Sequence, residues 1–247
     1  SPICPPSSPA AHAEGRRSRP KQKRPHPTTA NMPTVDECIE CNASTAAEEL
    51  KMNPDDVLAR LKILNEKFCN GEAGKAPLSA EEKQAITVTQ KPLVGLISCA
   101  DSRVPVEIIF SSGPGDLFVA RNAGNVYCPA TAASLDYGVK HLGIKLLVVM
   151  GHQCCGAVKA AQLPSDAIAG ETPDLVTLLN GIKKGLGDLE QIDNKVAHDR
   201  NAVSTNVRAQ VKAMGENPVY AAKVDVGDLK IVGAFYEMAT GKVHFLD

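Results

Sequence analysis

Three side chains able to bind a metal follow two short apolar stretches of the chain. Cys99 comes directly after residues 93–98, and His152 and Cys155 come shortly after residues 145–150. His152 and Cys155 are three residues apart, a spacing at which two side chains on a turn can converge on one ion. Two thiolates and one imidazole suit zinc, and three protein ligands leave a fourth position for water. The pattern therefore predicts one catalytic Zn²⁺ per chain.

Two charged residues stand beside the first of these ligands. Asp101 and Arg103 follow Cys99 by two and four positions. A single buried Cys or His is most often an ordinary core residue, but charges crowded at the end of an apolar strand are costly unless they have a role. The combination therefore favours a reactive metal site over a purely structural use of the ligands.

The ligands can meet only if the stretches that carry them are neighbouring strands. Residues 93–98, 116–120 and 145–150 are short, continuous apolar runs typical of buried parallel strands. Helical patterns lie between and after them, over residues 131–142, 157–162, 174–186 and 190–214. In such an alternating α/β sheet, ligand sites lie beyond the carboxyl ends of the strands. Both ligand motifs are expected there.

The two ends of the folded region carry further signals. Asn53 and Pro54 begin a helical pattern whose apolar residues recur through Phe68, which predicts an amphipathic N-terminal arm. Residues 229–237 and 242–245 flank a turn signal, which predicts a hairpin and an antiparallel edge strand. The predicted fold class is α/β: a mostly parallel central sheet with an antiparallel edge strand, flanked by helices.

Composition argues for an ordinary globular domain. Hydrophobic residues make up 43% of the 247 residues, charged residues make up 22%, and the formal net charge is -1. This balance provides no general attraction to nucleic acid or to anionic membranes. No apolar run approaches the roughly 20 residues that span a bilayer. We expect neither a nucleic-acid nor a membrane partner, and a single catalytic domain over residues 51–247.

Residues 1–50 differ from the rest. Eight of the 17 prolines fall before residue 34, together with a basic run from Arg16 to Arg24, and such a composition cannot build a packed core. We expect a disordered or leader segment. It predicts a chloroplast or mitochondrial location if it is a transit peptide, and a cytoplasmic one otherwise, with Met32 as an alternative true start.

The eight cysteines are expected to be reduced rather than a disulfide framework. Cys38 and Cys41 form a C-x-x-C pair, but no second pair follows, so we interpret them as noncatalytic. Cys154 neighbours a ligand and is expected to point away from the metal, although an exchange of roles with Cys155 stays open. Cys69 and Cys128 are interpreted as helix-end and loop residues.

The order of the motifs resembles one family. C-x-D-x-R at Cys99–Arg103, followed by H-x-x-C at His152–Cys155, is similar to the signature of beta-class carbonic anhydrases. The similarity runs from about Asn53 to the C-terminus and includes residues 115–125. It implies a zinc lyase that hydrates carbon dioxide reversibly to bicarbonate and a proton, a role in carbon utilization, and attack by zinc-bound hydroxide.

The resemblance also implies roles for the charged pair. Asp101 accepts a hydrogen bond from the zinc-bound hydroxide and orients it, while Arg103 keeps the carboxylate ionised. If Arg103 released Asp101, the carboxylate could swing onto zinc and exclude water, as in some family members. We regard this as a hypothesis about pH control.

Three more positions match the substrate pocket of the plant-like branch: Gln90, Phe118 and Tyr137. Gln90 would donate to a substrate oxygen, and the two aromatic rings would form an apolar wall, although each alone is more often a surface or core residue. Gly156 would present its backbone N–H or simply allow tight packing. Family members take the aromatic residues from the neighbouring subunit, which implies a homodimer or a larger homo-oligomer.

Several alternatives stay open at this stage. His141, His198 and His244 could relay protons, but surface or capping roles are commoner. The same fold could hydrolyse carbon disulfide or carbonyl sulfide, or could serve as a noncatalytic zinc-binding regulatory protein. A redox protein is the least supported alternative.

Overall fold

The structure is a computed structural model that describes residues 51–72 and 74–246. The predictions made for residues 1–50, including the disordered or leader segment and the Cys38/Cys41 pair, lie outside the described residues.

A five-stranded sheet forms the centre of this region. Its strands are β1 (Val94–Cys99), β2 (Leu117–Asn122), β3 (Leu146–His152), β4 (Lys230–Glu237) and β5 (Lys242–Leu246). The spatial order is β2-β1-β3-β4-β5. The first four strands pair in parallel, and β5 pairs with β4 in the antiparallel direction. The predicted fold class and the antiparallel edge strand are confirmed.

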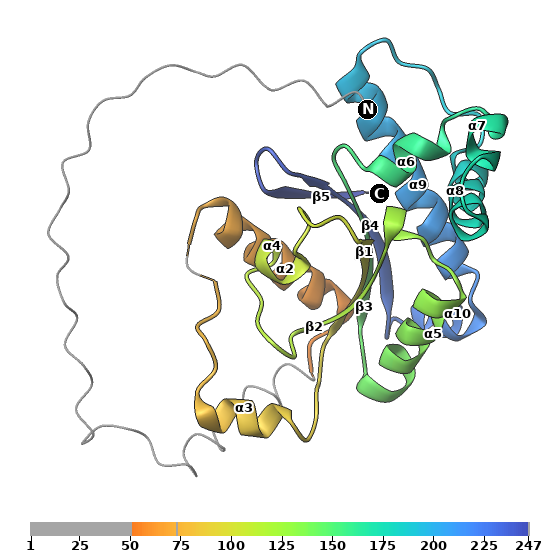
Figure 1. The fold of residues 1–247 in the computed structure, drawn as a ribbon. Helices are drawn as coiled ribbons and strands as arrows, with labels where there is room; N and C mark the ends of the chain where they lie inside the picture. The colour runs from red at the N-terminus through yellow and green to blue at the C-terminus, as the bar shows by residue number, and fades with distance from the viewer. Residues whose placement is uncertain (1–50, 73, 247) are drawn as a thin grey trace, which may run out of the picture. The chain divides into compact units, whose positions relative to one another are not determined.

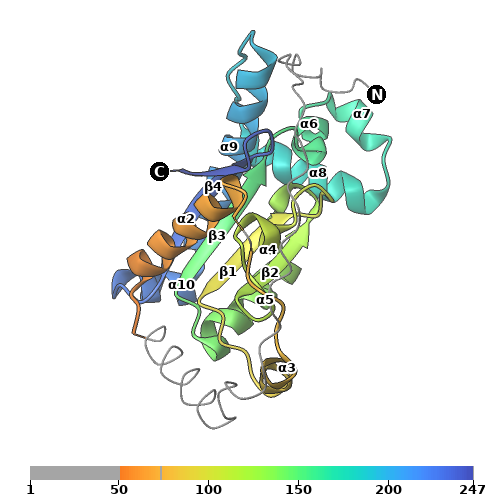
Figure 2. The ribbon, with the colours of Figure 1, turned by 90° about the vertical axis from the view of Figure 1, so that its left-hand side faces the viewer.

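Helices cover both faces of the sheet, as Figure 1 shows with the sheet seen nearly edge-on. The helices are α2 (Pro54–Cys69), α3 (Ala80–Ile86), α4 (Val106–Ile109), α5 (Pro129–Tyr137), α6 (Gly156–Ala161), α7 (Ser165–Ala169), α8 (Pro173–Leu186), α9 (Lys195–Gly215) and α10 (Pro218–Asp225). α2 and α4 lie on one face, and α5, α8, α9 and α10 lie on the other. Figure 2 shows the first face from the side that carries α2.

The central strands are apolar because they are buried on both faces. Every residue of β1 and β3 is buried. Leu96 and Val148 pack toward the face with α2, while Ile97 and Val149 pack toward the opposite face. Since successive side chains of a strand point to opposite faces, a strand covered on both sides has no polar alternation. The continuous apolar runs of the sequence have this origin.

Two helices begin at asparagine caps: α2, which is the predicted N-terminal arm, and α9, which is the longest described helix. The Asn53 side chain accepts hydrogen bonds from the backbone N–H groups of Asp55 and Asp56, and α2 begins there as predicted. α9 begins at Lys195 and not near Glu190, so that boundary was predicted wrongly. The Asn194 side chain accepts from two backbone N–H groups of the first turn and fixes the later start.

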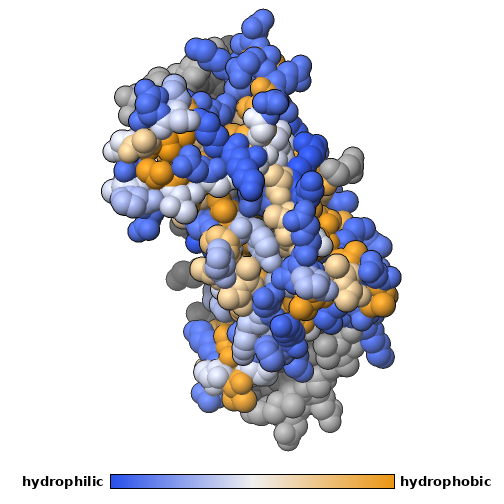
Figure 3. Space-filling view, turned by 90° about the vertical axis from the view of Figure 1, so that its right-hand side faces the viewer, coloured by the Kyte–Doolittle hydropathy of each residue, from blue (hydrophilic) through white to orange (hydrophobic). Residues whose placement is uncertain are grey.

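The outer surface of the described region is mostly polar on the side seen in Figure 3. The face that carries α7, α8 and α10 is mostly hydrophilic, with small scattered groups of apolar residues (Figure 3). Within residues 51–72 and 74–246, no helix has both the length and the apolar character needed to cross a bilayer.

Candidate metal centre

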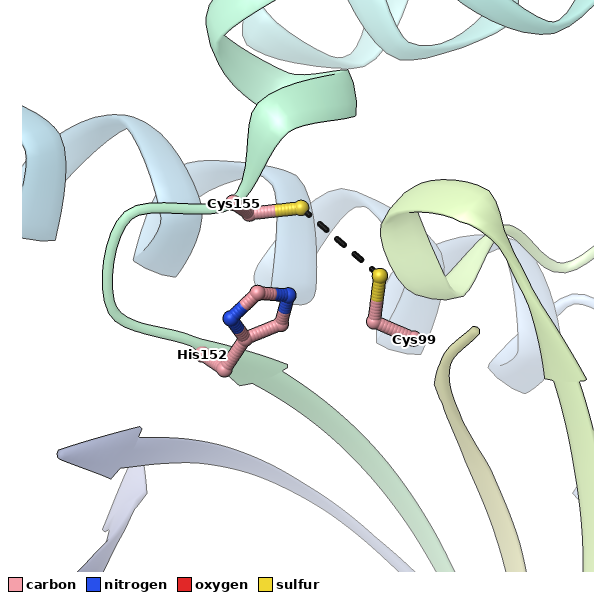
Figure 4. Close-up of side chains that lie close together, drawn as sticks. All are labelled: Cys99, His152 and Cys155. Carbon is pink, nitrogen blue, oxygen red and sulfur yellow. Dashed lines mark hydrogen bonds between the residues drawn. The ribbon is translucent and has the colours of Figure 1, made fainter. Parts of the chain in front are cut away.

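The three predicted ligands meet at the carboxyl ends of β1 and β3. Cys99 ends β1, His152 ends β3, and Cys155 is the residue from which α6 begins. Their side chains point toward one another (Figure 4), and their ligand atoms all lie within 4.8 Å of one another. The two sulfur atoms are 3.9 Å apart. The sequence spacing therefore predicted a cluster that the fold does assemble.

Close packing behind β3 sets the position of the second motif. A Cβ atom on Gly151 would lie 2.6 Å from Val203 Cγ1 and 2.8 Å from Val207 Cγ2, so glycine lets α9 approach the strand. After His152 the chain turns sharply, and Cys154 adopts a left-handed backbone with φ of 56°. This turn brings Cys155 back toward His152.

His152 is held in the state that a metal ligand requires. The side chain is fully buried, and its Nδ1 lies 2.9 Å from the backbone oxygen of Gln153. Donation from Nδ1–H to that oxygen leaves Nε2 as the atom with a free lone pair. Among the described residues, Nε2 has no hydrogen-bond partner although it is buried. A buried, unpartnered nitrogen beside two sulfurs fits a zinc ion.

The two thiols share their protons unequally. Donation from the Cys155 thiol, opposed by burial and aided by His152 and the Gly124 N–H, lowers the pKa of Cys99. The Gly124 nitrogen lies 3.4 Å from Cys99 Sγ. The contact with Cys99 and then burial raise the pKa of Cys155. Of the two sulfurs, Cys99 therefore becomes a thiolate more readily, and a divalent cation is the partner that would stabilise both as thiolates.

Asp101 and Arg103 form a two-pronged ion pair beside the ligands. Arg103 donates from Nε to Asp101 Oδ1 at 2.9 Å and from a terminal nitrogen to Oδ2 at 2.7 Å. These bonds, opposed by burial, hold the pKa of Asp101 well below its usual range. Asp101 Oδ2 also lies 3.9 Å from His152 Nε2, so an ionised carboxylate stands close to the ligand atoms.

Arg121 is a contributor that sequence reasoning missed. It donates from Nε to the backbone oxygen of Cys99 at 2.9 Å, and from a terminal nitrogen to that of Asp101 at 2.7 Å. Its side chain thus fixes the backbone on both sides of Ala100. The available signal was a charge near the end of β2, a strand that pairs with β1.

The residues predicted for the substrate pocket lie away from the three ligands, near the start of β1. Gln90 and Tyr137 line a pocket of ≈ 470 Å³. The Phe118 ring stacks on Tyr137, with centroids 6.4 Å apart. Phe118 pairs with Gly95 at the start of β1, whereas Cys99 ends that strand. Four residues of strand span about 13 Å, so within one chain this pocket does not meet the ligands.

The surroundings of Gly156 and of the three histidines predicted as possible proton relays follow from their contacts. A Cβ atom on Gly156 would meet nothing within 4 Å, so the described residues give no steric reason for glycine there. His141 packs against Tyr137, His198 contacts Gln162, and His244 Nε2 lies 3.6 Å from a Glu237 oxygen. Among the described residues, His152 is the only histidine in the ligand group.

The other cysteines of the described part of the chain stay outside the ligand group. Cys69, Cys128 and Cys154 form no disulfide bond. Cys69 ends α2, and Cys128 precedes α5, as predicted.

Together, the parallel sheet and the Cys-His-Cys cluster at its carboxyl edge define an α/β protein with a candidate metal site. The model of the carbonic anhydrase family matches residues 94–243, and the chain belongs to this family, in its beta class. Carbonic anhydrase 2 of Mycobacterium tuberculosis is 32% identical over 206 residues, which cover 79% of this chain and 94% of that protein. The carbonic anhydrase of Mycolicibacterium smegmatis is 33% identical over 201 residues, covering 77% and 92%.

Solved structures agree with these matches. A tetrameric beta-carbonic anhydrase from Sordaria macrospora superposes with a TM-score of 0.61 at 28% identity, covering 66% of this chain and 85% of the other. A Coccomyxa beta-carbonic anhydrase in complex with acetazolamide superposes with a TM-score of 0.59 at 25% identity, covering 87% of each chain. The narrower resemblance to the plant-like branch stays a prediction.

Proposed function

We propose that this enzyme hydrates carbon dioxide reversibly to bicarbonate and a proton, with one zinc ion per subunit held by Cys99, His152 and Cys155. One observation carries the proposal: an ionised carboxylate, fixed by two bonds from Arg103, stands 3.9 Å from the unpartnered Nε2 of a buried histidine. A structural metal site has no need for such a neighbour, because its four ligands close the coordination sphere.

Cys99, His152 and Cys155 would hold the zinc ion, which would lower the pKa of a bound water toward about 7 and so supply hydroxide at neutral pH. Asp101 would accept a hydrogen bond from that hydroxide, so that a lone pair of the hydroxide oxygen faces the carbon of the substrate. Asp101 must stay ionised for this purpose, and the bonds from Arg103 hold its pKa well below neutrality. Arg121 keeps the backbone around Asp101 in place.

A second copy of the chain is proposed to complete the site. Gln90, Phe118 and Tyr137 lie at the end of the sheet opposite the ligands, so they can serve a metal only in another subunit. Tyr137 is 53% exposed, which leaves its ring available to a partner. Gln90 would donate to a substrate oxygen, and the rings would line a path for uncharged carbon dioxide. The related Sordaria enzymes are described as tetrameric. We propose a homodimer or a larger homo-oligomer.

The test is stopped-flow carbon dioxide hydration by the purified full chain, with zinc content measured on the same samples. Cys99→Ser is expected to lose both zinc and activity. Asp101→Ala is expected to keep zinc and to lose on the order of a hundredfold in kcat, because it removes an orienting acceptor. Cys69→Ser, the control for Cys99→Ser, replaces a cysteine on α2 and is expected to alter neither the zinc content nor the hydration rate.

Hydration at the wild-type rate by both Cys99→Ser and Asp101→Ala would reject the mechanism. A zinc-loaded wild-type chain that hydrolyses carbonyl sulfide or carbon disulfide but does not hydrate carbon dioxide would replace the proposed substrate. A zinc-loaded chain with none of these activities would indicate a noncatalytic zinc protein.

A further inference from the structure

α9 contacts two segments that build the metal centre. Asp199 Oδ2 accepts a hydrogen bond of 2.8 Å from the backbone N–H of Cys154, between the ligands His152 and Cys155. Asn206 Nδ2 donates at 2.9 Å to the backbone oxygen of Gly124, the residue whose N–H faces Cys99. Positions 199 and 206 are seven residues apart, close to two helical turns, so both side chains leave the same face of α9.

Asp199 holds a turn that the backbone alone does not favour. Cys154 has φ of 56°, a left-handed conformation that is uncommon for residues other than glycine. The carboxylate of Asp199 secures the N–H of this residue, and Arg103 contacts its backbone oxygen at 3.4 Å. Strained backbone persists where surrounding contacts fix it. The conformation of this turn sets the spacing between His152 and Cys155.

Asn206 holds the other segment through a buried amide chain. It is fully buried, and its Oδ1 accepts from Gln210 Nε2 at 3.1 Å. Gln210 Oε1 in turn accepts from the backbone N–H of Tyr127 at 2.9 Å. Gly124 has φ of 73°, and a Cβ atom there would lie 2.6 Å from Ile182 Cδ1. Asn206 therefore fixes a glycine that packing already confines, with its N–H directed at the Cys99 sulfur.

α9 is a firm base for both contacts. Its Val203 and Val207 pack so closely on Gly151 that no side chain fits between the helix and β3. α9 therefore packs against β3, the strand that ends in His152, and also holds the turn at Cys154 and the segment at Gly124. Polar residues that hold metal ligands in place commonly alter metal affinity when they are replaced.

We propose that Asp199 and Asn206 are positioning residues for the metal centre, which preset the spacing of His152 and Cys155 and the position of the Gly124 N–H beside the Cys99 sulfur, and thereby slow metal release. The inference rests on the zinc site of the proposed function. It concerns how the chain holds the ion, and its readouts do not require turnover.

The first test measures the rate at which the zinc-loaded full chain transfers zinc to an excess of chelator. Asp199→Leu is expected to release zinc about 10–100-fold faster, the range usual for loss of a group that supports a ligand. Asp199→Asn keeps an oxygen that can accept from the Cys154 N–H, and its release rate is expected to stay within about threefold of wild type. Rescue by the conservative variant separates the hydrogen bond from mere occupation of space.

The second test uses the cobalt-substituted protein, whose sulfur-to-metal absorption band reports on the thiolates. Asn206→Leu leaves the Gly124 oxygen unpaired and is expected to shift this band and to accelerate zinc release about tenfold. Ser204→Ala, another buried change on α9, is expected to leave both unchanged. Met214→Ala is the control for stability, because it opens a cavity near the end of the helix far from the ligands.

Wild-type release rates and an unchanged cobalt band in both Leu variants would overturn the proposal. So would equally fast release from Met214→Ala at a matched loss of stability, because general loosening of α9 would then explain the effect. Wild-type protein that binds zinc and responds to these substitutions, yet hydrates no carbon dioxide, would reject the proposed function and leave the positioning role standing.

Discussion

At the carboxyl ends of β1 and β3, one chain supplies three ligands, a fixed carboxylate and the helix behind them. At the amino end of β1, the same chain supplies an open pocket lined by Gln90 and Tyr137. In the first region, which we call the metal end, the ligands are buried: His152 and Cys155 are 0% exposed. The second, the pocket end, presents Val88 at 85% exposure and Tyr137 at 53%.

The contrast shows what one chain specifies by itself. Contacts at the metal end are short and mutually supporting, so its geometry is settled within the subunit. The pocket end gathers apolar and amide groups around a space that no ligand of the same chain can reach. Neighbouring exposed apolar residues of this kind mark surfaces that another molecule covers. The two ends become one active site if two copies meet.

Mixed dimers test this relation with the largest expected effect. One subunit carries Cys99→Ser and the other carries Gln90→Ala, with different tags for purification of the mixed species. If the pocket of one subunit serves the metal of the other, this dimer retains one intact site and about half of the wild-type activity. If each pocket serves its own metal, activity falls on the order of a hundredfold through loss of the Gln90 donor. Stopped-flow hydration distinguishes the two outcomes.

The matched control places both substitutions in one subunit and pairs it with a wild-type subunit. The expectation is then reversed, because the single remaining metal meets the defective pocket and activity is low. High activity in this control together with low activity in the first mixture would contradict a site shared between subunits.

A pair of glycine substitutions compares the stability of the two ends. Gly151→Ala at the metal end forces a Cβ atom to within 2.6 Å of a Val203 methyl, on a side chain with a stiff χ1. Gly95→Ala at the pocket end meets the flexible tip of Leu147 at 2.8 Å. We expect Gly151→Ala to lower the free energy of unfolding by about 3 kcal/mol and Gly95→Ala by about 1 kcal/mol.

Denaturant unfolding of both variants measures this difference, and chelator transfer measures zinc release. Gly151→Ala is expected to release zinc faster, whereas Gly95→Ala is expected to match wild type. Equal losses of stability with equal release rates would remove the distinction between the two ends.

The metal end was the more predictable region. Two short motifs placed Cys99, His152 and Cys155 at strand ends, and parallel strands bring such ends together. The strand boundaries differ from the predicted ones by only one or two residues, because fully buried strands leave continuous apolar runs. Local sequence patterns were therefore enough to predict most of the fold and the ligand cluster.

Contacts between distant parts of the chain could not be predicted in this way. Asp199 meets a residue 45 positions away, and Asn206 meets one 82 positions away. Both looked like polar residues of an amphipathic helix, because their partners are backbone groups without a side-chain pattern. The separation of Gln90 from the ligands within the chain was equally invisible, since sequence distance from a motif does not give its direction along a strand.

The smallest expected effect concerns a charge at the carboxyl end of β4. Glu237 accepts from Thr240 Oγ1 at 2.7 Å and lies near His244 and Arg200. The bond from Thr240, opposed by burial and aided by His244 and Arg200, lowers the pKa of Glu237. A carboxylate with a lowered folded-state pKa stabilises the protein above its unfolded pKa of about 4.3, and this contribution is lost as the pH falls through the folded value.

Glu237→Gln is therefore expected to cost less than about 1 kcal/mol at pH 7, since the side chain is 28% exposed, and the difference from wild type is expected to close as the pH falls below about 4. Denaturant titrations across pH measure this difference, and Thr240→Val should reduce it because it removes the first partner. A Gln variant as stable as wild type at pH 7, or a gap that widens in acid, would show that the edge of the metal end gains nothing from this charge. The zinc-release rate of this variant should stay at the wild-type value, because Glu237 is not one of the described residues in the ligand group and the Asp199 and Asn206 contacts remain.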